Sequence, residues 1–483
     1  MDKTKIFLIN PPTMSSQFMA SDTYLPTGLL YLATVLKNNN FNIKIVDVNN
    51  HFYKKQLGKD ILENYVKQKL LPQIKEYAPK IVGIGCLFSG VFGSLILIAR
   101  EVKKHFPDLR IVIRGIHPTI FARRVLQKYN FIDYVIIGEG EFSFLQLCKM
   151  IEVDEHQNIS KIDGVAFREN GSICINDKTN FISRLDDLPF VDYSLIDLQE
   201  YNLDMRSWYN PKKLDINQSF PIITSRSCPQ KCNFCSMRFV HGPKIRLRSA
   251  DNVLDEIDLL YNQYNARYFH FMDDNMTFDK QRTIEICNGI VKRNLNIHFD
   301  APNGFAINKL DEEVVDALVE AGMVRISLAV ESGSEFIRNK VIGKGLSAKK
   351  IFEVFDTCAR HKNLFIVSFF IIGMPEETVD TLDETYQLIM KLPLDSIGVF
   401  YATPYPGTRL FDYCVGNGLI SGETGNYLDC EQFYHITNKP HFKPHDLTID
   451  QLVDFKRKCE EYMQKNRAAS RFPACYPLRF EEL

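Results

Sequence analysis

The sequence IITSRSCPQKCNFCS, residues 222–236, joins a short β-branched run to three cysteines at intervals of four and three residues. The apolar run predicts a buried strand over residues 221–225, and Cys228, Cys232 and Cys235 follow in the loop after it. This spacing lets one short loop place three thiolates around a single metal centre, and thiolates select soft metals. The residues alone leave two interpretations open, a zinc site or an iron-sulfur cluster.

The fourth ligand separates these two interpretations. Zinc needs a fourth protein ligand, and the nearest candidate is His241, six residues after Cys235. Three cysteines alone would instead leave one iron of a 4Fe-4S cluster open to an external ligand. The other nine of the twelve cysteines are scattered singly, and we expect them to be small buried side chains.

The residues on both sides of the cysteine loop predict a partial barrel, because β-branched runs alternate with amphipathic helical patterns. We expect strands at 221–225, 268–272, 297–301, 324–329, 366–372 and 396–401, and helices at 250–264, 280–293, 312–321, 348–361 and 378–391. Six strand-helix units are two short of a closed eightfold barrel. We therefore expect a partial (β/α)6 barrel with its site at the carboxyl ends of the strands.

The N-terminal part predicts a separate, doubly wound α/β domain. Its expected strands are 5–9, 43–46, 81–86, 110–113 and 134–137, with helices at 28–38, 61–77, 95–106 and 119–128. A ligand should lie at the strand ends, on the loops 10–13, 86–90, 114–119 and 138–141. We place this domain at 1–150, a hairpin-like extension and linker at 151–218, the barrel at 219–415 and a small α-rich C-terminal cap or substrate region at 416–483.

Composition sets the broad class of protein. A length of 483 residues suggests about three globular units. With 58 basic and 59 acidic side chains, the net charge of -1 predicts neither a nucleic-acid partner nor an acidic membrane surface.

The uncharged run 81–99 is nearly long enough to span a bilayer, but glycines divide it into a strand, a turn and a helix start, so we expect no integral membrane segment. Sparse cysteines and the absence of a signal-peptide pattern predict a cytoplasmic protein.

Together with its setting, the cysteine loop resembles a known family. The pattern CxxxCxxC with Phe234 before the last cysteine, after the first strand of a partial barrel, resembles the radical S-adenosylmethionine (SAM) superfamily. The resemblance implies that Cys228, Cys232 and Cys235 bind a 4Fe-4S cluster and are the catalytic and metal-binding residues. It also implies that SAM binds at the open iron.

The resemblance places further SAM contacts at later strand ends. FMDDN at 271–275 resembles the stretch that holds the SAM amino group, although helix capping by its carboxylates remains the alternative. AVESGS at 329–334 resembles the stretch that reaches the SAM ribose or carboxylate, and FIIGMPE at 370–376 resembles the adenine-contacting GxIxGxxE segment, with Phe369 in place of its first Gly. ATPYPGT at 402–408 also matches the superfamily. The implied SAM-binding residues are Phe234, Asp273, Asp274, Glu331, Ser332, Ile371, Gly373 and Glu376.

The N-terminal domain resembles the cobalamin-binding domain of cobalamin-dependent radical SAM enzymes. RGIHPT at 114–119 and GEGE at 138–141 resemble the cobalamin loops of that family, where small residues let the backbone approach the corrin. The implied cobalamin-binding residues are Pro12, Ser89, Gly115, His117, Gly138, Glu139 and Gly140.

This domain departs from the cobalamin pattern at two loops. Residues 10–14, NPPTM, lack the DxHxxG whose histidine ligates cobalt in mutases and methionine synthases, so cobalt would lack a protein imidazole. Arg114 stands where the family has the first Gly of a pair, and it would contact the corrin amides or the nucleotide phosphate, or point to solvent. His117 is a candidate cobalt ligand, but a His-Pro turn at a strand end favours a structural role.

The resemblance implies a methyltransferase that acts on an unactivated carbon of a small-molecule substrate. A 5'-deoxyadenosyl radical would remove hydrogen, methylcobalamin would supply the methyl group, and a second SAM would re-methylate cobalt. An external electron donor of the flavodoxin or ferredoxin type is implied. The alternatives are a cyclase or rearrangement enzyme with the same cofactors and a non-catalytic sensor. Methylthiotransferases use three N-terminal cysteines, and only Cys86, Cys148 and Cys174 are present for that role.

Overall fold

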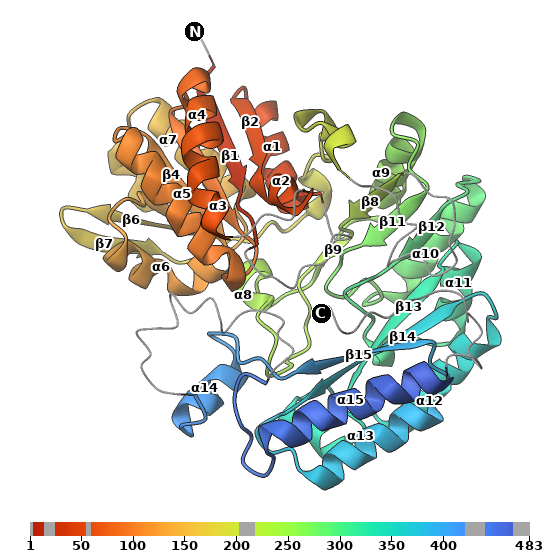
Figure 1. The fold of residues 1–483 in the computed structure, drawn as a ribbon. Helices are drawn as coiled ribbons and strands as arrows, with labels where there is room; N and C mark the ends of the chain where they lie inside the picture. Colours follow the sequence, from red (N-terminus) through yellow and green to blue (C-terminus); the bar gives the residue numbers. More distant parts are fainter. Residues whose placement is uncertain (1–2, 14–24, 55–58, 202–217, 421–439, 467–483) are drawn as a thin grey trace. The chain divides into compact units, whose positions relative to one another are not determined.

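The computed structural model describes residues 3–13, 25–54, 59–201, 218–420 and 440–466, which form two compact units (Figure 1). Unit 1 contains the described residues up to Tyr201 together with residues 236–243. Unit 2 contains residues 218–235, 244–420 and 440–466. Most of the expected linker, at 202–217, and parts of the expected C-terminal region, at 421–439 and 467–483, lie outside the described residues.

A seven-stranded sheet organises unit 1, with strand order β2-β1-β3-β4-β5-β6-β7. Its parallel strands are β1 (Lys5–Asn10), β2 (Asn42–Asp47), β3 (Ile81–Cys86), β4 (Arg110–Gly115) and β5 (Tyr134–Ile136). The hairpin β6 (Val165–Glu169) and β7 (Ser172–Asn176) continues the sheet antiparallel to β5. The predicted doubly wound α/β architecture is confirmed, and the expected hairpin belongs to this same sheet.

Helices cover both faces of this sheet, as the alternating pattern predicts. They are α1 (Thr27–Asn38), α2 (Val48–Lys54), α3 (Lys59–Tyr65), α4 (Leu71–Tyr77), α5 (Phe92–His105), α6 (Ile116–Lys128) and α7 (Glu141–Glu152). The predicted helix over 61–77 is α3 and α4 joined by a π-helical turn, η1 (Val66–Leu70). Short 3-10 helices are η2 (Ser89–Val91), η3 (His156–Lys161), η4 (Leu185–Asp187), η5 (Tyr193–Leu195) and η6 (Leu198–Glu200). Buried leucines, isoleucines and valines of α1 and α7 pack on the sheet to form the core.

Unit 2 is the predicted partial (β/α)6 barrel. Its first parallel sheet has the order β12-β11-β8, and its second has the order β13-β14-β15. Bridges from Phe299 to Met323 and from Phe305 to Leu328 connect the two sheets. The strands are β8 (Ser219–Ile222), β11 (Tyr268–Phe271), β12 (His298–Asp300), β13 (Arg325–Glu331), β14 (Phe365–Ile372) and β15 (Ser396–Tyr401), with a separate short pair, β9 (Ser225–Arg226) and β10 (Arg246–Leu247).

Polar N-caps fix the start of each barrel helix directly after a strand-end loop. The side chains of Ser249, Asp279, Asp311, Ser347 and Thr378 each accept a hydrogen bond from a backbone N–H of the first turn. The helices that they begin are α9 (Ala250–Gln263), α10 (Lys280–Lys292), α11 (Glu312–Glu320), α12 (Ala348–Arg360) and α13 (Val379–Lys391). The caps therefore limit the length of the loops that carry the site. Unit 2 also contains η7 (Ile307–Lys309) and the π-helical η8 (Phe336–Val341), whereas the short helix α8 (Arg238–His241) belongs to unit 1.

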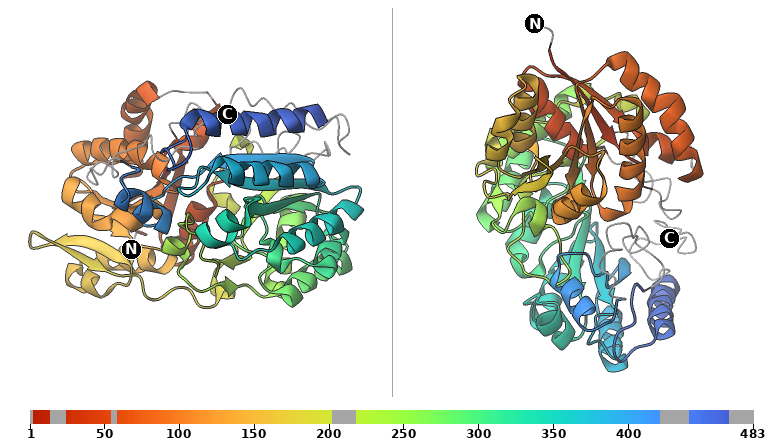
Figure 2. Two further views of the ribbon diagram at one scale, coloured as in Figure 1. Left: turned by 90° about the horizontal axis from the view of Figure 1, so that it is seen from below. Right: turned by 90° about the vertical axis from the view of Figure 1, so that its left-hand side faces the viewer.

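Beyond the barrel, the structure describes α14 (Arg409–Gly416) and α15 (Ile449–Asn466). Helix α15 lies along α13 and against β15 (Figures 1 and 2). The ring of Tyr386 on α13 contacts those of Phe455 and Tyr462 at centroid distances of 6.5 and 5.9 Å. This helix therefore extends the outer helical layer of the barrel. Across the described ranges, no helix is long and apolar enough to cross a membrane.

Candidate active site

The three cysteines lie between β9 and α8, in the loop that follows the first barrel strand. None of the three forms a disulfide, and each side chain is partly exposed. The loop is attached to the rest of unit 2 through Asn233, whose N–H donates to Ile342 O at 2.9 Å and whose carbonyl accepts from Leu410 N at 3.0 Å. The three sulfurs are therefore carried by a backbone that is fixed at its centre.

The donor set suits a cluster better than a zinc ion. Burial raises the pKa of the Cys228 thiol and raises that of Cys232 to about 12, while nearby Lys344 opposes both shifts. A cationic iron centre would stabilise the buried thiolates. His241, the fourth ligand that zinc would need, has its Nδ1 3.6 Å from Oε1 of Glu139 within unit 1. Among the described residues, no three His, Cys, Asp or Glu side chains are grouped closely enough to hold one metal ion.

Asp273, predicted to bind the SAM amino group, is buried and already bonded. Its Oδ1 accepts hydrogen bonds from the Thr224 hydroxyl at 2.8 Å, from the Ser225 hydroxyl and from Thr224 N at 3.2 Å. Burial raises the pKa of this carboxyl, against the lowering effect of these donors. The carboxylate therefore ties the end of β11 to the residues after β8, and its contact with SAM stays a prediction.

The next two residues continue this connection toward the cysteines. Asp274 accepts a hydrogen bond from Ser227 N at 3.0 Å. Asn275 places its Nδ2 3.6 Å from the sulfur of Cys228. Sequence reasoning missed Asn275, although its position directly after the acidic pair was a signal for it.

At the end of β13, Glu331 forms a buried ion pair that the sequence pattern did not predict. Its Oε1 lies 2.6 Å from Nζ of Lys344, and both side chains are 7% exposed. Burial alone lowers the pKa of Lys344, but Glu331 and the Cys232 sulfur raise it, and the net shift is upward. Glu331 also adopts a left-handed backbone conformation, φ 72°, next to a register shift in the strand pairing. A charged pair thus lies beside the cysteine loop.

Ser332, the neighbouring predicted contact, bonds to a helix outside this pair. It is fully buried, and its hydroxyl lies 3.2 Å from that of Thr385 on α13. Arg338, also buried, donates to the carbonyls of Ser332 and Leu346 at 2.7 Å. The hydroxyl and the guanidinium therefore hold the loop after β13 in place.

Two adjacent glutamates end the segment after β14, and the structure distinguishes them. Glu376, the predicted motif residue, is exposed. Glu377 is fully buried, and its Oε2 accepts hydrogen bonds from the N–H groups of Gly373 and Met374. Gly373 has φ 84°, a conformation that favours glycine, and Ile371 is partly exposed between buried neighbours. Sequence reasoning missed Glu377, because one residue of turn register decides which glutamate points inward.

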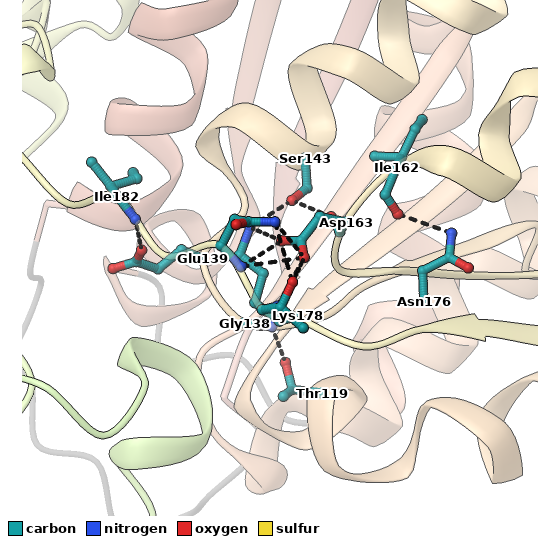
Figure 3. A network of polar contacts seen from close by, with 11 residues as sticks. Thr119, Gly138, Glu139, Ser143, Ile162, Asp163, Asn176, Lys178 and Ile182 are labelled. Atoms are coloured by element: carbon teal, nitrogen blue, oxygen red, sulfur yellow. Dashed lines mark hydrogen bonds and ion pairs between the residues drawn. The ribbon is translucent and has the colours of Figure 1, made fainter.

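In unit 1, a polar network surrounds the loop Gly138–Gly140 (Figure 3). The Gly138 N–H donates to the Thr119 hydroxyl at 3.0 Å, and the buried carboxylate of Glu139 accepts from Ile182 N at 3.0 Å. Lys178 bridges Ser143 and Asp163 at 2.9 and 3.0 Å. The segment after β7, which carries Lys178 and Ile182, therefore helps to hold the predicted cobalamin loop in place.

The other predicted cobalamin residues lie at the strand ends of the same sheet. Pro12 is buried after β1, and Gly140 precedes α7. Gly115 has φ 123°, and a Cβ there would lie 1.8 Å from the carbonyl oxygen of Cys86. Only glycine therefore permits this approach of β4 to β3.

His117 and Ser89 bond to each other inside the unit. The imidazole is fully buried between the rings of Phe92 and Phe121, at 4.2 and 4.8 Å, and its Nδ1 lies 2.9 Å from the Ser89 hydroxyl. This packing agrees with the structural role that the His-Pro turn favours. Contact of either residue with cobalamin stays a prediction.

Arg114 is partly buried and bonded within unit 1, and its contact with cobalamin stays a prediction. Its Nη1 donates to the carbonyl of Gly28 at 2.9 Å, and a Cβ on Gly140 would meet its Nε at 3.0 Å. The side chain therefore lies between the first turns of α1 and α7. It borders a small apolar hollow lined by Leu8, Leu29, Leu32, Gly83, Ile84, Val112, Ile136 and Phe144.

Comparison with known proteins defines the class of enzyme. Residues 222–389 match the Radical SAM superfamily, and residues 20–147 match the B12 binding domain. The fold is similar to that of the radical SAM methyltransferase TsrM from Kitasatospora setae, with a TM-score of 0.65 and 16% identity over 86% of this chain and 75% of that one. The chain therefore carries a B12-binding domain followed by a radical SAM domain.

The alignments with three curated relatives cover nearly the whole chain. An uncharacterized methyltransferase of Pyrococcus horikoshii is 29% identical over 95% of this chain and 92% of its own length. The cytidylyl-2-hydroxyethylphosphonate methyltransferase of Streptomyces wedmorensis is 26% identical, covering 90% and 85%. The anaerobic magnesium-protoporphyrin IX monomethyl ester cyclase of Cereibacter sphaeroides is 26% identical, covering 93% and 68%. The protein is a cobalamin-dependent radical SAM enzyme with a 4Fe-4S cluster, SAM and cobalamin as its cofactors.

Proposed function

We propose that this enzyme transfers a methyl group to an unactivated carbon of a small molecule, with Cys228, Cys232 and Cys235 as the cluster ligands. The observation that carries the proposal is the loop that places three cysteines, none of them in a disulfide, at a barrel strand end beside the buried pair Glu331 and Lys344. When bound, the cluster supplies one electron for the cleavage of SAM, and cobalamin supplies the methyl group. The chain itself holds, orients and shields these groups.

The pair Glu331 and Lys344 suits the amino-acid end of SAM. That end carries an ammonium and a carboxylate, so each charge of the pair finds a partner of opposite sign on the ligand. Binding would exchange one buried ion pair for two, and neither side chain would be left as an uncompensated buried charge. We therefore place the SAM carboxylate at Lys344 and its ammonium group toward Glu331.

Two of the three relatives described above are methyltransferases, which supports methyl transfer. The cyclase relative favours a second candidate, ring closure or rearrangement with the same cofactors. None of the ten described cysteines forms a disulfide, which supports the reducing cytoplasm as the compartment. The electron would come from a donor of the flavodoxin or ferredoxin type.

The test counts the products of SAM. The full chain is reconstituted without oxygen, with iron, sulfide and hydroxocobalamin, and incubated with a reductant, cell extract and SAM that carries a deuterated methyl group. Methyl transfer predicts S-adenosylhomocysteine and 5'-deoxyadenosine in equal amounts, and a labelled product by mass spectrometry. Formation of 5'-deoxyadenosine without S-adenosylhomocysteine would contradict methyl transfer and favour the second candidate.

The cluster assignment has its own control. Replacing Cys228, Cys232 and Cys235 by Ala should remove the bound iron and abolish 5'-deoxyadenosine formation. Cys174→Ala removes a free, partly exposed thiol that lies outside the loop, and it should leave both unchanged. Retained SAM cleavage in the triple variant would overturn the assignment of the three cysteines.

A further inference from the structure

Asn275 is a buried polar residue beside a cysteine of the loop, and none of the roles above uses it. Its side chain is 1% exposed, and its Nδ2 lies 3.6 Å from Sγ of Cys228, within hydrogen-bond reach of a sulfur acceptor. Within the described part of the chain, its Oδ1 has no hydrogen-bond partner. The amide is thus held out of water with its N–H group directed at the sulfur.

The contact continues a series of hydrogen bonds that join the residues after β11 to those after β8. Asp273 accepts from Thr224 and Ser225, and Asp274 accepts from Ser227 N at 3.0 Å. Asn275 then reaches Cys228, one residue further along both segments. These hydrogen bonds fix the two segments relative to each other, and the Asn275 amide is thereby held next to the sulfur of Cys228.

A hydrogen bond to a cluster sulfur has a defined redox consequence. One-electron reduction adds one negative charge to the cluster and its ligand sulfurs, and no bond is made or broken. An N–H donor at a ligand sulfur stabilises the more negative state, so it raises the reduction potential. Asp274, at the same strand end, carries a charge that acts in the opposite direction.

We propose that Asn275 is a positioning residue for the iron-sulfur cluster, and that its N–H donation to Cys228 Sγ raises the reduction potential of that cluster. The proposal rests on the assignment of Cys228, Cys232 and Cys235 as its ligands.

The experiment compares two variants with a matched control. Asn275→Leu keeps the approximate volume and removes the donor, and Asn275→Asp keeps the shape but replaces the donor by a carboxylate. Asn303→Leu is the control, because the Asn303 amide donates to the backbone oxygen of Met272 at 3.0 Å, near the same strand end. Each full-length protein is reconstituted without oxygen, iron and sulfide are quantified, and the cluster is titrated with dithionite and redox mediators in the absence of SAM.

The readout is the signal of the reduced cluster in electron paramagnetic resonance, followed against potential. We expect Asn275→Leu to shift the reduction equilibrium about tenfold toward the oxidised cluster, which corresponds to ~59 mV. Asn275→Asp should shift it further, and Asn303→Leu should match the unaltered protein. If Asn275→Leu binds less iron than the unaltered protein, the potential measured for Asn275→Asp alone tests the proposal. An unchanged potential in a fully loaded Asn275 variant overturns the proposal, whereas failure of the unaltered chain to bind a cluster overturns the cluster assignment instead.

Discussion

Glu376 and Glu377 are adjacent in sequence but differ in environment. Glu377 is fully buried, and burial raises its pKa from 4.5 to about 8. The hydrogen bonds that it accepts from two backbone N–H groups lower the pKa, but their effect is smaller than that of burial. Between these pH values the unfolded chain releases this proton and the folded chain keeps it. The stability that the protonated group provides is therefore complete below about pH 4.5 and is lost as the pH rises through about 8.

Replacing Glu377 by Gln should remove this pH dependence, because the amide stays neutral while its oxygen still accepts from Gly373 and Met374. The free energy of unfolding of Glu377→Gln, relative to the unaltered protein, should rise between about pH 4.5 and 8 by at most about 1.4 kcal/mol per pH unit. Urea unfolding at intervals across this range measures it. Glu376→Gln, an exposed control, should give no such trend. A flat difference for Glu377→Gln would contradict the burial argument.

At the scale of single residues, the sequence predicted where the site lies in the chain but not which groups its side chains contact. The spacing of Cys228, Cys232 and Cys235 is a local property that is readable without a structure. Asp273 and Asn275 are two residues apart on the same loop, yet one bonds to Thr224 and the other reaches Cys228. Which groups a side chain meets depends on how β8 and β11 pack, and no local pattern encodes that packing.

At the scale of elements, the loop after β13 depends on close contact with α13. The Gly333 N–H donates to the Thr385 hydroxyl at 3.0 Å. A Cβ at Gly333 would lie 2.4 Å from the Cα of Thr385 and 2.5 Å from the carbonyl oxygen of Glu384. Both obstacles are backbone atoms, so neither rotates away.

Gly333→Ala should therefore push α13 from the end of β13. We expect a loss of about 1–3 kcal/mol in the free energy of unfolding, the usual cost of overpacking. Gly416→Ala provides the control, because a Cβ there has nothing within 4 Å. Thermal and urea unfolding of both variants checks this. Equal stability of the two variants would show that the contact is looser than the distances indicate.

The hydrophobic periodicity of the sequence predicted where strands and helices form better than it predicted which of them pair or pack together. All eleven strands expected in the two domains correspond to observed strands, because alternation and helical periodicity are local. The hairpin β6 and β7 was expected, but its antiparallel pairing with β5 was not, since a polar hairpin does not reveal which edge it joins. Likewise, the C-terminal helix was expected, but its packing on α13 and β15 was not. Pairing and docking are long-range properties, which single-sequence patterns do not contain.

At the scale of the whole molecule, the residues proposed for the two metal cofactors belong to different units. The cysteines lie in unit 2, and the predicted cobalamin residues, from Pro12 to Gly140, lie in unit 1. Unit 1 has its own sheet and its own core of buried side chains from α1, α7 and the strands. Each set of residues is thus held by a separate hydrophobic core, which predicts that one cofactor site survives damage to the other.

Two variants should separate the sites. Replacing all three loop cysteines by Ala should remove iron but leave cobalamin binding within about twofold, because no proposed cobalamin contact changes. Gly115→Ala should do the reverse, since its Cβ would collide with the backbone of Cys86 at the end of β3 and disturb the cobalamin loops, while the cysteine loop keeps its iron. Absorbance of cobalamin and iron content after gel filtration measure both. If the cysteine variant also lost cobalamin, the two sites would be coupled, and cluster binding would be needed to complete the cobalamin site.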